Sequence, residues 1–276
     1  MIPDSRLDEL LVEDSPHGDL TTDALGIGAL PGRMVYSARE PLVLAGAEEA
    51  ARLLGRVGCT ARLHHGSGAS LRPGDVILEA DGPASALHLG WKVALHLLEQ
   101  LSGIATRTRR IVEAARSGVH GRDVPIAATR KGFPGTRDLA LLGVRAGGGI
   151  SHRFGLSDSI LVFAQHTVFL EAGGLPMAIA RVRMRQPERK IVVEVGTLED
   201  AVIAARAGAD VVQVEKVAPG PFAEVVAACR GTIVAATGGI DESNAEAYAA
   251  AGADLLVTSA PYASRPAEIR VVVTAR

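Results

Sequence analysis

The chain has 276 residues, of which 47% are hydrophobic and 22% charged, a composition that excludes an intrinsically disordered protein and supports one large or two modest domains. Its 29 lysines and arginines are balanced by 31 aspartates and glutamates, so the net charge of −2 gives no global attraction to nucleic acid or to a membrane surface. The two cysteines, Cys59 and Cys229, stand too far apart to suggest a metal motif or a disulfide framework.

The N-terminal segment does not have the pattern of a targeting sequence. Its residues, MIPDSRLDELLVEDSPHGD, are acidic and mixed, unlike a secretory signal peptide. The sequence contains no run of about 18 apolar residues, so we expect no membrane span. A soluble protein of the reducing cytoplasm is the default expectation.

The first part of the chain mixes helix and strand signals. Helical spacing is found at 47–57, where Ala50, Leu53 and Leu54 fall on one face. A long helix is expected near 86–118, and it should be buried because it is apolar on most sides. Further elements are a short helix at 7–12 and strands within 33–45, at 59–64 and at 75–80. These signals predict a small α/β domain.

After His120 the pattern of secondary-structure signals changes, and short β-rich runs alternate with Ala-rich helical stretches. We expect helices at 197–207, 221–229 and 242–251. The expected strands are 125–129, 160–163, 191–195, 211–214, 232–236 and 255–258. This alternation predicts a parallel sheet with helices packed outside it.

A weak internal sequence repeat indicates how that sheet is arranged. AARAGADVVQV at 204–214 resembles AAAGADLLVTS at 249–259, and each reads as a helix end, a glycine and a new strand. The matching glycines, Gly208 and Gly252, are 44 positions apart with one strand between them, so each strand–helix step takes about 22 residues, as in a closed or nearly closed barrel. A doubly wound open sheet is the alternative, which we disfavour because no G-x-G-x-x-G follows the first strand.

Cationic side chains gather in the segment ATRKGFPGTRDLALLGVRAGGGISHRFGLSD. They are Arg130, Lys131, Arg137, Arg145, His152 and Arg153. Arginine binds a carboxylate or a phosphate through two parallel hydrogen bonds, and Arg130 and Lys131 follow a predicted strand, where barrels have their active sites. A solvated basic face is the alternative. We favour a site for a small anionic ligand.

Two glycine-rich turns are candidates for binding an anion through backbone N–H groups. Thr237-Gly238-Gly239 lies between the strand TIVAA and a predicted helix, the usual arrangement of a barrel phosphate site, and Ser259-Ala260 after the last strand could complete it. The triplet at 147–149 is weaker evidence, because glycines also occur in flexible loops.

Two carboxylates lie near the ends of apolar strands. A carboxylate inside an apolar strand is costly without a partner, so Glu194 and Glu215 at neighbouring strand ends suggest a divalent cation or sugar hydroxyls. The alternative is a salt bridge to Lys216 or Lys190. His166 fits a structural histidine as well as a ligand-binding one.

Several motifs match one family in order and spacing: EDSPHGDLTT at 13–22, GDVILEADGPASAL at 74–87, LEQLSGIATRT at 98–108, TRKGFPG at 129–135, GGGISHRFGLSD at 147–158, VEVG at 193–196 and TGGI at 237–240. On these motifs the chain resembles the quinolinate phosphoribosyltransferase (nicotinate-nucleotide pyrophosphorylase, carboxylating) family along nearly its whole length. Within that family it looks most like the ModD branch of pyrophosphorylases, which is associated with molybdate-transport genes.

The resemblance implies a two-domain α/β fold. A small N-terminal α/β domain, residues 1–113, is followed by an incomplete, open TIM-like barrel, residues 114–262, and the tail 263–276 is expected to pack back on the first domain. The resemblance also implies a magnesium-dependent transfer from phosphoribosyl pyrophosphate to a small heteroaromatic acid. It further implies a homodimer in which the N-terminal domain of one subunit covers the barrel of the other.

Roles for individual residues follow from the same resemblance. Arg130, His152 and Arg153 would hold the carboxylates of the acceptor, with Lys92, Phe163 and His166 on the same side. Lys131 would bind phosphoribosyl pyrophosphate, and Glu194 and Glu215 would contact the ribose or its magnesium. The 5′-phosphate would be bound by Thr237, Gly238, Gly239, Ser259 and Ala260.

The departures from the family pattern fall mainly on the acceptor side. The arginine that the family sends from its long helix is Lys92, and the lysine of its Lys-Asp-Asn-His run is Phe163, followed by Ala164, Gln165 and His166. The Asn before His-Arg is Ser151, the usual Asp-Asn is Glu215-Lys216, and the final phosphate-loop glycine is Ser259. Because cations are lost, we expect the same donor with an altered acceptor and poor use of quinolinate itself.

Two other classes of function stay open. A barrel aldolase could use Lys131 as a Schiff-base amine, although the neighbouring arginines argue against the dry pocket that such a lysine needs. A non-catalytic protein that binds a nucleotide or a molybdenum-related ligand is the second alternative, and the altered acceptor residues are its best support.

Overall fold

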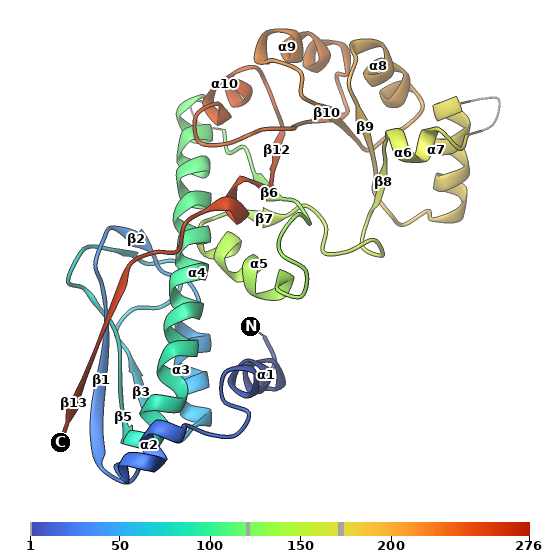
Figure 1. Ribbon diagram of the computed structural model, residues 1–276. Helices are drawn as coiled ribbons and strands as arrows, with labels where there is room; N and C mark the ends of the chain where they lie inside the picture. Colours follow the sequence, from blue (N-terminus) through green and yellow to red (C-terminus); the bar gives the residue numbers. More distant parts are fainter. Residues whose placement is uncertain (1, 120–121, 171–173) are drawn as a thin grey trace. The chain divides into compact units, whose positions relative to one another are not determined.

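The computed structural model describes residues 2–119, 122–170 and 174–276. By its contacts the chain divides into two units (Figure 1). Unit 1 consists of the residues up to Arg109, with Phe133–Gly148 and Pro261–Arg276, and unit 2 consists of Arg110–Gly132 and Gly149–Ala260. Within the described residues, no helix has the length and apolar character needed to cross a membrane.

Unit 1 contains a four-stranded antiparallel sheet of order β13-β1-β5-β3. Its strands are β1 (Pro31–Ala38), β3 (Thr60–Leu63), β5 (Val76–Pro83) and β13 (Ile269–Ala275), and a separate pair joins β2 (Leu42–Val43) to β4 (Ser70–Leu71). Along β1 every second residue is buried, among them Met34, Tyr36 and Ala38, so one face of the sheet covers the core. The Tyr36 hydroxyl donates a hydrogen bond of 3.0 Å to the carbonyl of Trp91, which ties the long helix to that face.

The helices of unit 1 supply the other half of its core. They are α1 (Asp4–Asp14), α2 (Leu20–Leu25), α3 (Ala47–Arg56), α5 (Arg137–Ala146) and most of α4 (Ala84–Ser117), and a short 3₁₀ helix, η1 (Ala260–Ala263), begins at the unit boundary. The predicted helical face of α3 is the buried one, because Ala50, Leu53 and Leu54 are all inaccessible to solvent. The predicted long helix near 86–118 is α4.

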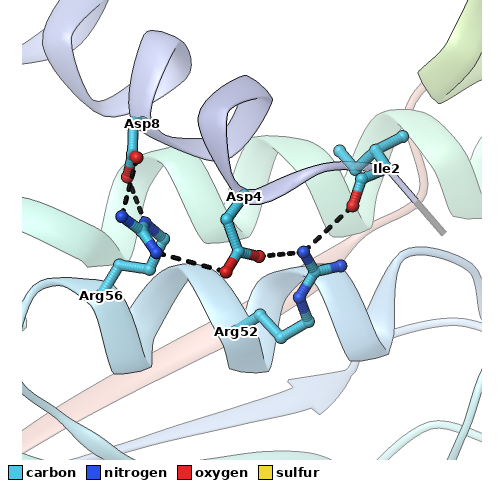
Figure 2. Close-up of polar contacts among 5 residues, drawn as sticks. All are labelled: Ile2, Asp4, Asp8, Arg52 and Arg56. Atoms are coloured by element: carbon cyan, nitrogen blue, oxygen red, sulfur yellow. Dashed lines mark hydrogen bonds and ion pairs between the residues drawn. The ribbon is translucent and has the colours of Figure 1, made fainter.

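Two turns of charged residues join α1 to α3 (Figure 2). Asp4 and Asp8 are one helical turn apart on α1, and Arg52 and Arg56 are one turn apart on α3, so the two pairs face each other in register. Arg52 donates to Asp4 and, at 3.0 Å, to the carbonyl of Ile2, while Arg56 donates to Asp8 and, at 3.3 Å, to Asp4. Below these ion pairs the fully buried Leu7 anchors α1 by apolar contact.

The segment Phe133–Gly148, which the sequence analysis assigns to the barrel, belongs to unit 1 by its contacts. Its helix α5 packs closely on α4, and the absence of a side chain at Gly147 permits this close approach. A Cβ at Gly147 would lie 2.5 Å from the carbonyl oxygen of Ala105 and 2.5 Å from the Cβ of Thr108. This glycine of the 147–149 triplet is therefore explained by helix packing rather than by an anion.

Unit 2 is a curled, seven-stranded parallel half-barrel of order β7-β6-β12-β11-β10-β9-β8. This confirms the predicted open TIM-like barrel, and the doubly wound alternative is wrong. The strands are β6 (Ile126–Ala128), β7 (Ile150–Ser151), β8 (Ile160–Val162), β9 (Ile191–Val195), β10 (Val211–Glu215), β11 (Ile233–Thr237) and β12 (Leu255–Thr258). The helices α6 (Ala164–Thr167), α7 (Gly174–Arg185), α8 (Leu198–Arg206), α9 (Pro219–Ala228) and α10 (Ala245–Ala250) follow them, and α8 to α10 lie along the outer side of the strands (Figure 1).

Side chains alternate between the two faces of the half-barrel with a period of two. The outward residues, such as Val193, Val212 and Val234, belong to the large core formed with the helices. The inward residues form a small apolar cluster of their own: Ala127, Val192, Val211, Ala235 and Val257. Two positions further along β9, β10 and β11, the inward residues are Glu194, Gln213 and Thr237. The half-barrel therefore has an apolar floor and a polar layer above it.

Candidate active site

The carboxyl ends of the unit 2 strands surround a cavity of about 570 Å³, a volume within the usual range for small-molecule sites. The structure brings most of the proposed site residues together around it. Those that line it are Arg130, Lys131, His152, Arg153, Phe163, Glu194, Glu215, Thr237, Gly238, Gly239, Ser259 and Ala260. They lie in or directly after all seven strands of the half-barrel, so the site depends on the curvature of the whole sheet and not on one local motif.

Two proposed residues do not line the cavity. Lys92 lies on α4 in unit 1, where it is exposed and its Nζ is 4.4 Å from the centroid of the Trp91 ring. His166 lies on α6, where its Nδ1 accepts a hydrogen bond of 3.3 Å from the Phe163 N–H and its ring meets the Phe163 ring edge-on at 4.2 Å. Of the predicted cationic segment, Arg137 and Arg145 lie on α5 in unit 1 and not at the cavity.

The cations of the cavity include one that is almost fully buried. Arg153 is 7% exposed, and among the described residues no carboxylate lies within 4 Å of it to form an ion pair. Burial first, and the charge of Arg130 second, lower the pKa of Arg153, while Glu194 opposes the shift. A guanidinium stays charged in proteins, so this group needs an anion. A ligand carboxylate or phosphate would supply one.

The pKa of His152, which lies beside Arg153, is also lowered. Burial is the main cause, and the charge of Arg153 adds to it, so the pKa of His152 is lower than its ordinary value. The side chain of Gln213 acts in the opposite sense, because it favours the protonated ring. A bound carboxylate would shift the balance further toward protonation.

The two predicted carboxylates face the same cavity but have different neighbours. Glu194 accepts a hydrogen bond of 2.6 Å from Nε2 of Gln213, the residue beside it in register on β10. Glu215 forms an ion pair of 3.2 Å with Lys216, as the alternative interpretation proposed. The side chain of Lys216 is 74% exposed, so this pair contributes little and leaves Glu215 available to a ligand.

Gln213 is a cavity residue that the sequence analysis missed. The signal was present, because Gln213 is the one polar residue within VVQV and lies two positions before Glu215, on the same face of the strand. Thr129, Thr258 and Asp241 also line the cavity and were not proposed for the site.

The loop after β11 is fixed by its glycines. Gly238 and Gly239 have φ values of 88° and 85°, which are strained for other residues, and a Cβ at Gly238 would lie 2.9 Å from the backbone N of Lys216.

The helix that we expected from Glu242 begins at Ala245 instead. Asp241 explains the delay, because its side chain accepts a hydrogen bond of 2.8 Å from the Ser243 N–H and stabilises a turn in place of the first helical residues.

The donor set for a metal ion is limited to hard oxygen ligands. Among the described residues, no group of three or more His, Cys, Asp and Glu side chains is close enough to hold a metal. Glu194 and Glu215 do face one cavity, and Mg²⁺ is commonly bound by one or two carboxylates together with phosphate oxygens of a substrate. These residues therefore fit magnesium that arrives with a phosphorylated ligand.

Comparisons with known proteins agree with this geometry. The family model described as "Quinolinate phosphoribosyl transferase, N-terminal domain" matches residues 19–102, and "Quinolinate phosphoribosyl transferase, C-terminal domain" matches residues 104–271. The chain is 46% identical over 249 residues to "Putative pyrophosphorylase ModD" of Rhodobacter capsulatus, which covers 89% of this chain and 95% of that protein.

More distant relatives share the whole fold. The nicotinate-nucleotide pyrophosphorylase (carboxylating) of Homo sapiens is 36% identical over 243 residues, covering 86% of this chain and 80% of its own. The crystal structure of NadC from Streptococcus pyogenes superimposes with a TM-score of 0.91 at 28% identity, covering 99% of this chain and 96% of that one. The resemblance drawn from the motifs is confirmed.

Proposed function

Because the chain belongs to the quinolinate phosphoribosyltransferase family and is thus a pentosyltransferase, we propose that it transfers phosphoribosyl from phosphoribosyl pyrophosphate to a heteroaromatic carboxylate related to quinolinate. One observation carries the proposal: the cations, two carboxylates and the glycine loop line a single cavity. A ring nitrogen of the acceptor attacks the anomeric carbon of the ribose, the bond from that carbon to the pyrophosphate oxygen breaks, and pyrophosphate leaves with the electron pair.

The donor side of the cavity, which we define as Lys131, Glu194, Glu215 and the loop Thr237–Gly239, recognises the phosphorylated sugar. The backbone of the loop binds the 5′-phosphate, and Lys131 binds the pyrophosphate. Glu194 faces the ribose and stabilises the positive charge that develops as the bond to pyrophosphate breaks. Magnesium, held by Glu194 and Glu215 with donor oxygens, would supply further charge neutralisation to the leaving group.

The acceptor side, which we define as Arg130, His152, Arg153, Phe163 and Gln213, recognises the ring. The buried cation Arg153 pairs with a ring carboxylate, and Arg130 supports it. Phe163 supplies an apolar wall that can stack on a ring but cannot neutralise a second carboxylate. The acceptor therefore carries fewer carboxylates than quinolinate, or a larger apolar part.

We also propose a homodimer with a shared site. Many like charges in one open cleft are unfavourable unless they are covered, and in the family pattern the partner's N-terminal domain covers the barrel. Lys92 of the partner subunit would then reach this cavity. The dimer should persist at nanomolar concentration in sedimentation experiments, and a monomer that still turns over substrate would rule out the shared site.

A panel of heteroaromatic acids tested with phosphoribosyl pyrophosphate and magnesium examines the whole proposal. We expect pyrophosphate release with at least one acid and little with quinolinate. Calorimetry should show that phosphoribosyl pyrophosphate binds well only with magnesium, so equal affinity in the presence of EDTA would exclude the metal role. Binding of the donor without release of pyrophosphate for any acid would favour a non-catalytic binding protein.

The aldolase alternative loses support from the structure. Lys131 is exposed, whereas a Schiff-base lysine needs a desolvated amine. Failure of borohydride to trap an adduct with a carbonyl substrate would remove this alternative.

A further inference from the structure

The side-chain carboxamide of Gln213 has a hydrogen-bond partner for its nitrogen but none, among the described residues, for its oxygen. The residue is 3% exposed and lies in the polar layer directly above the apolar floor of the half-barrel. Its Nε2 donates to Glu194 at 2.6 Å, but its Oε1 is buried and has no hydrogen-bond partner among the described residues. Buried carboxamide oxygens nearly always have a partner, so an orphaned one at the wall of a cavity needs an explanation.

The orientation of the carboxamide is determined by its neighbour. An ionised carboxylate can only accept hydrogen bonds, so Glu194 requires the NH₂ group of Gln213 and repels its oxygen. Rotating the amide by half a turn would bring two oxygens together at hydrogen-bonding distance. Oε1 therefore faces away from Glu194 whenever that carboxylate is ionised.

The side chain best placed to satisfy this oxygen does not do so. His152 lies near enough to Gln213 for the carboxamide to influence its pKa, but no hydrogen bond from its ring to Oε1 is present among the described residues. The in-register neighbours of Gln213 on the adjacent strands are Glu194, which needs its NH₂ group, and Ala235, which is apolar. The partner of Oε1 must then come from the contents of the cavity.

We propose that Gln213 determines which acceptor is used, by accepting a hydrogen bond from an N–H or O–H group of the acceptor ring. The acceptor is then a heteroaromatic ring that carries both a carboxylate, bound by Arg153, and a hydrogen-bond donor, bound by Gln213. This inference rests on the proposed phosphoribosyl transfer and specifies its substrate class. A ring that lacks the donor leaves Oε1 unsatisfied and should bind about ten- to hundredfold more weakly.

The test compares rings that differ only in a donor. The probes are pyridine-3-carboxylate and its four monoamino derivatives, each measured by calorimetry and by pyrophosphate release with phosphoribosyl pyrophosphate and magnesium. In the wild type, at least one amino derivative should bind about tenfold or more tightly than the parent ring. In Gln213→Met, which keeps the length of the side chain and removes its polar atoms, this preference should disappear.

Two further variants separate selection from structural support. In Gln213→Glu, a proton shared with Glu194 recreates one donor and one acceptor, so the preference for the amino ring should survive. Gln165→Met removes an exposed carboxamide from the same cavity and should keep the preference. Circular dichroism checks that each variant is folded.

The outcomes are distinct. The inference is overturned if the wild type binds no amino derivative, or binds none of them more tightly than the parent ring. It is also overturned if Gln213→Met keeps the preference. In these cases the proposed transfer can still stand. If no ring gives pyrophosphate, the proposed transfer fails, and the calorimetric preference still decides the role of Gln213.

Discussion

The two sides of the cavity differ in how far they rely on the backbone. The donor side depends largely on backbone, since Gly238 and Gly239 adopt left-handed conformations and Gly238 contacts the backbone of Lys216. The acceptor side depends on individual side chains, namely Arg153, His152, Phe163 and Gln213. The backbone donors of a loop are the same for most side chains, and only substitutions at its glycines displace them, whereas any substitution alters a side-chain wall. Our proposal of the same donor with an altered acceptor follows this difference.

The largest effect should come from breaking the backbone cradle. In Gly238→Ala, a Cβ would meet the Cγ and N of Lys216 at 2.6 and 2.9 Å, so the loop must move. We expect the affinity for phosphoribosyl pyrophosphate with magnesium to fall by about hundredfold or more in calorimetry. Gly208→Ala is the control, since Gly208 has a similar φ of 90° but nothing within 4 Å of its Cβ position. Equal losses in both variants would mean that backbone strain, not the cradle, is responsible.

Lys131 is the donor-side residue whose role depends on its side chain. Because it is exposed, Lys131→Ala should leave the thermal unfolding midpoint unchanged and lower kcat/KM by about hundredfold or more. Lys190→Ala removes another exposed lysine, away from the cavity, and should leave both quantities unchanged. An unfolded Lys131→Ala variant would identify a structural lysine instead.

The acceptor side should accept re-engineering without loss of the donor side. Phe163→Lys combined with Lys92→Arg restores two cations of the family pattern, and it should raise kcat/KM for quinolinate by about ten- to hundredfold. The KM for phosphoribosyl pyrophosphate should change little. If the unmodified protein already converts quinolinate at ordinary enzymatic rates, our interpretation of Phe163 is wrong.

The smallest effect is a pH dependence on the acceptor side. The pKa of His152 is lowered by burial, so just below its ordinary value of 6.5 the unfolded chain binds a proton that the folded chain does not. The free energy of unfolding should therefore decrease as the pH is lowered, by at most about 1.4 kcal/mol per pH unit. His152→Gln should flatten this dependence in urea unfolding between about pH 7.5 and about pH 5.5, whereas His17→Gln, at an exposed site, should not. Parallel curves for the wild type and His152→Gln would contradict this account.

Much of the half-barrel could be predicted because its strands are apolar and its turns carry glycine. The predicted bounds of β9 and β12 agree with the structure, and the other predicted barrel strands differ by one residue at one or both ends. The secondary-structure elements that were not predicted have weak or ambiguous signals in the sequence. The residues of α5 were interpreted as a cationic site segment, and β7 is only two residues long. β13 is mostly exposed, and it is paired along its whole length with β1.

The site shows the same division. Residues at strand ends, such as Glu194 and Thr237, could be predicted because parallel strands bring their carboxyl ends to one edge of a sheet. Gln213 was missed because it lies two positions before the end of its strand and its role depends on a neighbour in the next strand. The glycine at 147 was overinterpreted, because the sequence does not reveal which helix lies against it.

The pairing of β13 with β1 has a consequence for the order in which the chain folds. β1 precedes β13 by more than 200 residues in the chain, so during synthesis the sheet of unit 1 is incomplete until β13 has been made. Unit 2 has all of its residues before that moment and can close first. Until β13 arrives, β1 presents an open edge of unpaired N–H and C=O groups, the kind of edge at which chains aggregate. The pairing of β13 with β1 therefore protects the newly made protein from association with other chains at this edge.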